Sequence, residues 1–138
     1  MMEYKFQITE LLIRTFAGIL FLFQGYDKLF KIKMPGVINA FAADTDKNHV
    51  PLSLLKLMAY YTSIVEFIGG VFLLCGFFTT FTLYALGLDL LLVCLAFSYM
   101  EALWDMKHVF PIFLLVMVLL LLPENYRIFC LDYILHFK

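Results

Sequence analysis

Three ionisable side chains stand out in this 138-residue chain because each lies inside a different long apolar stretch. They are Arg14, Glu66 and Asp89. A charge at bilayer depth is costly, so such residues usually face the interior of a helix bundle and mark a functional site or a specific helix contact. Buried carboxyl groups can relay protons, and an arginine can orient a polar ligand. The three residues are therefore the candidate intramembrane polar site.

The composition indicates a membrane protein. Hydrophobic residues make up 64% of the chain and charged residues 15%, and the mean hydropathy is +0.92. A soluble domain carries about 45–50% apolar and about 25% charged residues. This excess is too large for one small core, so we expect lipid to be the solvent. The net charge of −1 and the lack of a basic tract argue against nucleic acid as a partner.

Long apolar runs predict four membrane-spanning helices, because a span needs about 20 mostly apolar residues. The segment between the first two runs, 31–50, contains turn signals and reads as a polar loop. After Pro123, apolar residues recur with helical spacing, which predicts a short amphipathic helix at the membrane interface. We therefore expect an all-α fold of one membrane domain, 1–138. Its predicted elements are spans at about 8–30, 52–77, 81–103 and 106–122 and an interfacial helix at about 126–137.

An even number of spans places both termini on one side of the membrane. More lysines flank the other side, and the positive-inside rule then assigns the 31–51 segment to the cytoplasm. A helix rise of about 1.5 Å per residue places Arg14, Glu66 and Asp89 at roughly 9, 16 and 12 Å from the side of the termini. Small residues flank each of them at helical spacing, which predicts that they face other helices. We therefore expect one shared charged layer.

Two interpretations of that layer remain open. It is either a structural ion pair that sets the helix register, or a proton-relay or ligand-binding site. Asp27 and Lys28 lie next to the membrane boundary and form a secondary set, read as interfacial anchors more than site residues. No histidine lies inside a span, which disfavours haem. The three cysteines are far apart, so no metal site is predicted. No resident cofactor is expected, and a quinone is the remaining candidate ligand.

Two segments carry a family resemblance. The run from Arg14 to Phe21, followed by Gly25-Tyr26-Asp27-Lys28-Leu29, resembles the first-span signature of the DoxX family of small membrane proteins. Glu66-Phe67-Ile68-Gly69-Gly70 resembles the second span of that family, and Pro123–Arg127 with Leu131-Asp132 resembles its closing segment. The resemblance covers about residues 8–133. It implies a four-helix membrane fold, with Arg14, Lys28 and Glu66 as the matching polar residues.

The resemblance also bears on function, since the family takes its name from a subunit of a thiosulfate:quinone oxidoreductase. The first hypothesis is an accessory, non-catalytic subunit of a redox assembly, quinone- or sulfur/thiol-linked, in the bacterial inner membrane. The alternatives are a quinone-binding oxidoreductase in its own right and a small transporter. Expected partners are the lipid bilayer and other membrane redox proteins, and a homo-oligomer is left open.

Overall fold

The structure is a computed structural model that describes residues 2–45, 51–100 and 106–135. Within these residues every regular element is helical and no strand occurs. The elements are α1 (Met2–Tyr26), the π-helical turn η1 (Asp27–Lys31), α2 (Lys33–Thr45), α3 (Leu52–Cys75), α4 (Thr79–Met100), α5 (Met106–Leu121), the 3-10 turn η2 (Glu124–Tyr126) and α6 (Leu131–Ile134).

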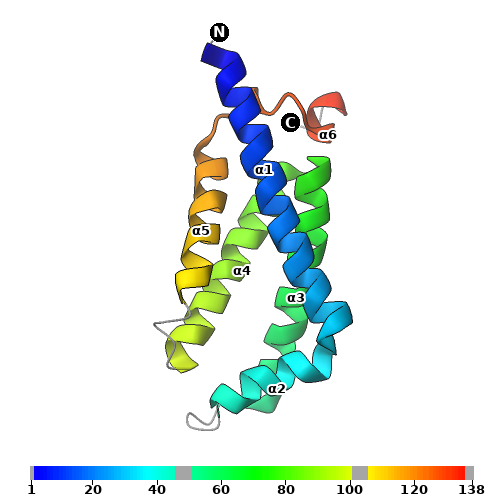
Figure 1. Cartoon of the computed structure of the whole chain (residues 1–138), viewed down its shortest axis with the longest axis vertical. Helices are drawn as coiled ribbons and strands as arrows, with labels where there is room; N and C mark the ends of the chain where they lie inside the picture. Colours follow the sequence, from blue (N-terminus) through cyan, green and yellow to red (C-terminus); the bar gives the residue numbers. More distant parts are fainter. Residues whose placement is uncertain (1, 46–50, 101–105, 136–138) are drawn as a thin grey trace.

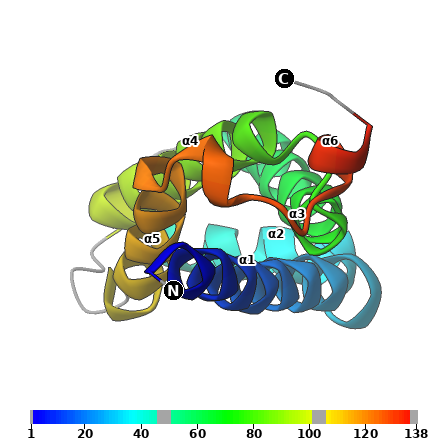
Figure 2. The same ribbon diagram turned by 90° about the horizontal axis from the view of Figure 1, so that it is seen from above.

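Helices α1, α3, α4 and α5 run along the long axis of the molecule, with α1 and α4 inclined to it (Figure 1). Helix α1 packs on α3, α3 on α4, α4 on α5 and α5 back on α1, so the four form a closed ring when viewed along the long axis (Figure 2). The N-terminus and α6 lie at one end, and α2 runs across the other (Figure 1). This topology places the start of α1 and helix α6 at the same end of the bundle (Figure 1).

Three helical segments are long and apolar enough to cross a membrane: Tyr4–Lys31, Leu52–Cys75 and Thr79–Ala96. The apolar part of α5, Val109–Leu121, is shorter. Large apolar side chains cover the outside of the bundle, as expected where lipid is the solvent. The interior holds a second set, namely Phe21, Leu73, Leu83, Leu86, Leu90, Val116 and Leu119. The predicted fold class, an all-helical membrane bundle, is therefore confirmed.

The segment read as a loop, 31–50, is helical over its described part. Helix α2 occupies Lys33–Thr45, and residues 46–50 lie outside the described residues. The prediction of a loop relied on Pro35 and Gly36 as turn signals. Proline is well tolerated in the first turn of a helix, where its missing N–H has no partner to lose. Pro35 therefore opens α2, and the helix buries Val37.

The predicted helix over 126–137 was also wrong. The chain forms the turn η2, then non-helical backbone, and only the four-residue helix α6, while residues 136 and 137 lie outside the described part. The cause is tertiary hydrogen bonding, because the backbone carbonyl of Phe129 binds Arg14 and the side chain of Asp132 binds the start of α4. The predicted third span ends at 103, and its last residues likewise lie outside the described part.

A three-residue connection, residues 76–78, joins α3 to α4. Gly76 ends α3 in the left-handed conformation, with φ +67°. The amide of Phe77 donates to the carbonyl of Phe72, and that of Gly76 donates to the carbonyl of Leu73. This is the Schellman arrangement, which favours glycine because a Cβ is strained at that φ. Close packing also favours glycine at position 76, since a Cβ there would lie 3.0 Å from Nη1 of Arg14.

Candidate functional site

Close glycine contacts set the register between α1 and α3. A Cβ on Gly18 would meet the side chain of Leu74 at 2.9 Å, and one on Gly25 would clash with the backbone of Phe67. A step of seven residues along α1 thus corresponds to seven residues back along α3. The same register places Glu66 level with about residue 26. That point is twelve residues from Arg14, or roughly 18 Å along the helix.

Lys28 and Glu66 form an ion pair at that level. The ammonium nitrogen of Lys28 donates to both carboxylate oxygens of Glu66, at 2.7 Å to Oε1 and 2.6 Å to Oε2. The Glu66 side chain is 4% exposed and the Lys28 side chain 25%. Lys28 lies in the π-helical turn η1, and turns of this kind often occur at functional sites. Lys28, which the sequence pattern indicated as an interfacial anchor, is therefore the direct partner of Glu66.

Asp89 lies level with Glu66 on the neighbouring helix. A Cβ on Gly69 of α3 would meet Leu86 of α4 at 2.8 Å, and the same antiparallel register brings Asp89 opposite Glu66. The Asp89 side chain is fully buried, and it interacts electrostatically with Glu66 and Lys28. Neither of its oxygens has a hydrogen-bond partner among the residues that the structure describes. We call Lys28, Glu66 and Asp89 the polar cluster.

Arg14 belongs to a different network, near the end of the bundle that holds the termini. Its Nε donates to Glu10 at 3.0 Å, its Nη1 to the carbonyl of Leu73 at 2.6 Å and its Nη2 to the carbonyl of Phe129 at 2.7 Å. The side chain is 1% exposed. All three guanidinium nitrogens are therefore held by this chain. They join α1, the end of α3 and residues 123–135, which we call the C-terminal segment.

The structure thus brings Glu66 and Asp89 to one level and separates Arg14 from both. The depth estimate took the start of the first span, near Ile8, as level with the end of the second, near Phe77. The glycine contacts instead place residue 77 opposite about residue 15, which shifts the two helices by seven residues. Glu10, the partner of Arg14, was missed, although its four-residue spacing is the usual one for a helical ion pair.

The secondary residue Asp27 lies outside the polar cluster. Its carboxylate pairs with Lys31 at 2.7 Å, and their side chains are 43% and 66% exposed. Such exposed pairs contribute little to stability. The interpretation of Asp27 as an interfacial anchor stays a prediction.

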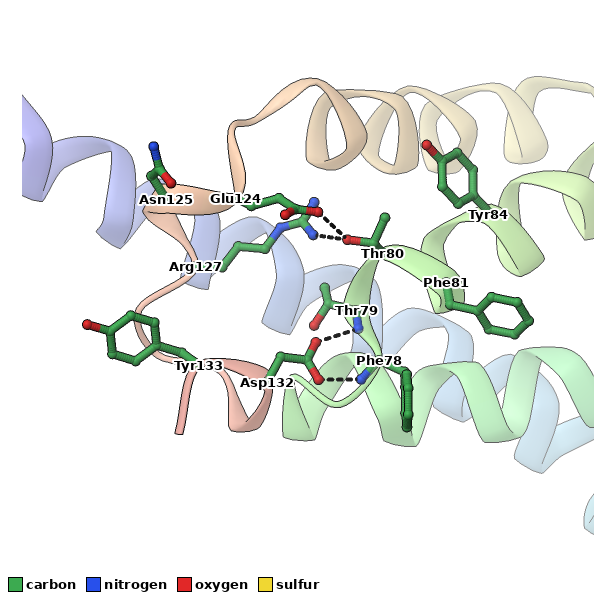
Figure 3. Close-up of a pocket in the computed structure, with 10 residues that line it drawn as sticks. All are labelled: Phe78, Thr79, Thr80, Phe81, Tyr84, Glu124, Asn125, Arg127, Asp132 and Tyr133. Carbon is green, nitrogen blue, oxygen red and sulfur yellow. Dashed lines mark hydrogen bonds between the residues drawn. The ribbon is translucent and has the colours of Figure 1, made fainter. Parts of the chain in front are cut away.

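The C-terminal segment is fixed to the start of α4 by a second set of polar contacts (Figure 3). Asp132 accepts hydrogen bonds from the amides of Phe78 and Thr79, at 2.6 and 2.7 Å. It thereby caps the first turn of α4, where amides lack partners within the helix. Arg127 donates to Thr80 Oγ1 and to the carbonyl of Leu119. The contact between Arg127 and Thr80 leaves no local pattern in the sequence, because the two residues are 47 positions apart.

These contacts border an open cleft of about 700 Å³ at the end of the bundle (Figure 3). Neither Arg14 nor any residue of the polar cluster lines this cleft. Within the described residues no group of three or more His, Cys, Asp and Glu is placed to hold a metal ion. The cleft is lined by Phe78, Thr79, Thr80, Phe81, Tyr84, Glu124, Asn125, Arg127, Asp132 and Tyr133.

Cys130 is part of the C-terminal segment and lies against Gly76. A Cβ on Gly76 would lie 2.8 Å from the Cα of Cys130, and the thiol is buried. Burial raises the pKa of the Cys130 thiol above its ordinary value, and nearby Arg14 opposes this shift with a smaller effect. A buried thiol of raised pKa holds little thiolate at neutral pH and reacts slowly.

Comparison with known proteins agrees with this geometry. The family model described as DoxX matches residues 9–100, which is two thirds of the chain. The chain belongs to the DoxX family. The matched region contains Arg14 and the whole polar cluster, and it confirms the resemblance drawn from the sequence. The C-terminal segment of this DoxX protein lies outside the match. No curated protein and no solved structure matches the chain.

Proposed function

We propose that this DoxX protein is an accessory integral membrane subunit of a redox assembly linked to quinone or to sulfur or thiol chemistry. In this proposal α5 crosses the membrane as a fourth span beside the three long apolar helices. The bundle then acts as a scaffold that holds partner proteins in the bilayer, and it carries out no reaction itself. Family membership supports the link to membrane redox chemistry.

The observation that carries the proposal is that every guanidinium nitrogen of Arg14 is held within the chain. The three nitrogens donate to Glu10, Leu73 and Phe129 and the side chain is 1% exposed, so this cation is committed to contacts within the fold. Lys28 likewise binds both oxygens of Glu66. Two of the intramembrane cations therefore join elements of this chain. A buried ion pair of this kind fixes geometry more than it adds stability.

The test is to purify the full chain from its native membranes in mild detergent and to identify by mass spectrometry what accompanies it. The expected result is a redox protein in stoichiometric amount. A chain that emerges alone, or only with copies of itself, overturns the subunit proposal.

A second candidate function, a quinone-binding oxidoreductase, is favoured by one observation. Asp89 is fully buried and its oxygens have no partner among the described residues, whereas buried polar groups normally have one. A quinone carbonyl beside Asp89 would supply that partner, and Asp89 would act as the proton donor. Titration of the purified chain with a soluble quinone tests this candidate. Binding that survives Asp89→Asn removes Asp89 from such a site.

A further inference from the structure

The polar cluster has fewer positive than potentially negative groups, whether or not the protein is a subunit of a larger assembly. The cluster contains one cation, Lys28, and two carboxyl groups, Glu66 and Asp89. Both contacts of the Lys28 ammonium go to Glu66. Asp89 is therefore left without a counter-charge among the described residues, at 0% exposure.

An isolated carboxylate in an apolar interior is strongly disfavoured, and such a group takes up a proton instead. The charged groups around Asp89 give no alternative. Lys28 from η1 is held by Glu66, and Glu66 from α3 is itself acidic. The buried hydrophobic core on α4 and α5 is made of apolar residues, among them Leu86, Leu90 and Val116. A proton is also the one ligand that needs no cavity at a fully buried side chain.

We propose that the polar cluster is a proton-binding site whose occupancy is set by the position of Lys28. With Lys28 on Glu66, Asp89 binds one proton and the cluster is neutral. If Lys28 moves to Asp89, the proton transfers to Glu66 and the count stays at one. If Lys28 leaves the cluster, both carboxyl groups are protonated, so a second proton enters.

The position of Lys28 makes such movement physically reasonable. Lys28 belongs to the π-helical turn η1, which leads directly into α2 at the end of the bundle (Figure 1). Its side chain is a quarter exposed, while Glu66 is almost fully buried. Any event that pulls on α2 therefore acts on the cation that controls the proton count. The bundle would in this way couple a displacement at its surface to proton uptake inside it.

Infrared difference spectroscopy of the purified full chain in lipid vesicles at neutral pH tests the proposal. The carbonyl stretch of a protonated carboxylic acid is separate from the carboxylate bands and reports the number of bound protons. The wild type should show one such group in the cluster. Asp89→Asn should show none. Glu66→Gln should also show none, because Lys28 then neutralises Asp89. Lys28→Gln should show two, and Lys28→Arg should match the wild type.

The Arg14–Glu10 pair provides the matched control, since it contains one cation and one carboxylate. Glu10→Gln should leave the band unchanged. A wild-type band that persists in Asp89→Asn overturns the proposal, as does Lys28→Gln without a gain in signal. Should Lys28→Gln fail to fold, the contrast between Asp89→Asn and Lys28→Arg decides the question. For this measurement the chain is produced and purified alone, so the result is independent of whether a redox partner accompanies it from native membranes.

Discussion

Gly70 of α3 lies directly against the backbone of Leu22 in α1, so close that a Cβ on the glycine would clash with the amide of Leu22. Contacts between helix backbones of this kind need a glycine and favour helix association in lipid. They also set the register of α1 on α3, and that register determines which charged residues meet. The Lys28–Glu66 pair therefore depends on a glycine that carries no charge itself.

Gly70→Ala should destabilise the bundle by about 1–3 kcal/mol, because the added methyl group has no room against a backbone that cannot rotate away. Thermal unfolding of the purified chain in mild detergent measures the change. Gly87→Ala is the matched control, since a Cβ there would meet its nearest neighbours, on Met117 and Val116, at 3.7 Å. That variant should be neutral or more stable by about 0.5–1 kcal/mol, from helix propensity. Equal effects in the two variants would contradict the assigned register.

Arg14→Gln should destabilise the chain by about 3–5 kcal/mol, the usual cost of breaking a buried charge pair by removing one partner. It should also free the C-terminal segment, because the carbonyl of Phe129 loses its donor. Limited proteolysis should then cleave near Arg127 faster than in the wild type. Lys31→Gln is the control, as its pair with Asp27 is exposed and worth about 0–1 kcal/mol. Unchanged proteolysis of Arg14→Gln would exclude Arg14 as the anchor of the segment.

The apolar runs predicted the long helices well, because in lipid a run of sufficient length has few alternatives to helix. The small residues around the intramembrane charges were also correctly read as facing other helices. Gly18 and Gly25 beside Arg14 and Lys28, and Gly70 beside Glu66, are buried between α1 and α3. Both successes come from local patterns that the sequence displays directly.

The register between helices was not predictable in the same way. Span ends are uncertain by several residues, and an error of seven residues between α1 and α3 was enough to place Arg14 beside Glu66 instead of Lys28. The prediction of a helix over 126–137 failed for a related reason. Its apolar spacing is helical, yet hydrogen bonds to Arg14 and to the first turn of α4 hold it in another conformation. Those partners lie more than fifty residues away in sequence.

Cys130 should report the opening of the C-terminal segment. Burial raises the pKa of its thiol, so in a variant that lacks Cys75 and Cys94 it should react slowly with a maleimide at neutral pH. The rate should still be rising with pH where the rate of an ordinary thiol has levelled off, because the thiolate form is the one that reacts. Asp132→Ala removes the cap of α4, exposes the thiol and lowers its pKa, so the reaction at neutral pH should accelerate several-fold. Equal rates with and without the cap would show that Asp132 does not hold the segment closed.

Glu66→Gln should weaken the recovery of the proposed partner several-fold while the chain itself stays folded. Glutamine keeps the size of the side chain but loses the charge that holds Lys28. Lys28 then has Asp89 as its remaining acidic neighbour, and its shift displaces η1 and α2 at that end of the bundle. Stoichiometry by mass spectrometry, with helix content by circular dichroism, measures both properties. Glu124→Gln is the control, because Glu124 is exposed and binds Thr80 at the opposite end. If the folded Glu66→Gln chain retains its partner in full, the polar cluster plays no part in docking.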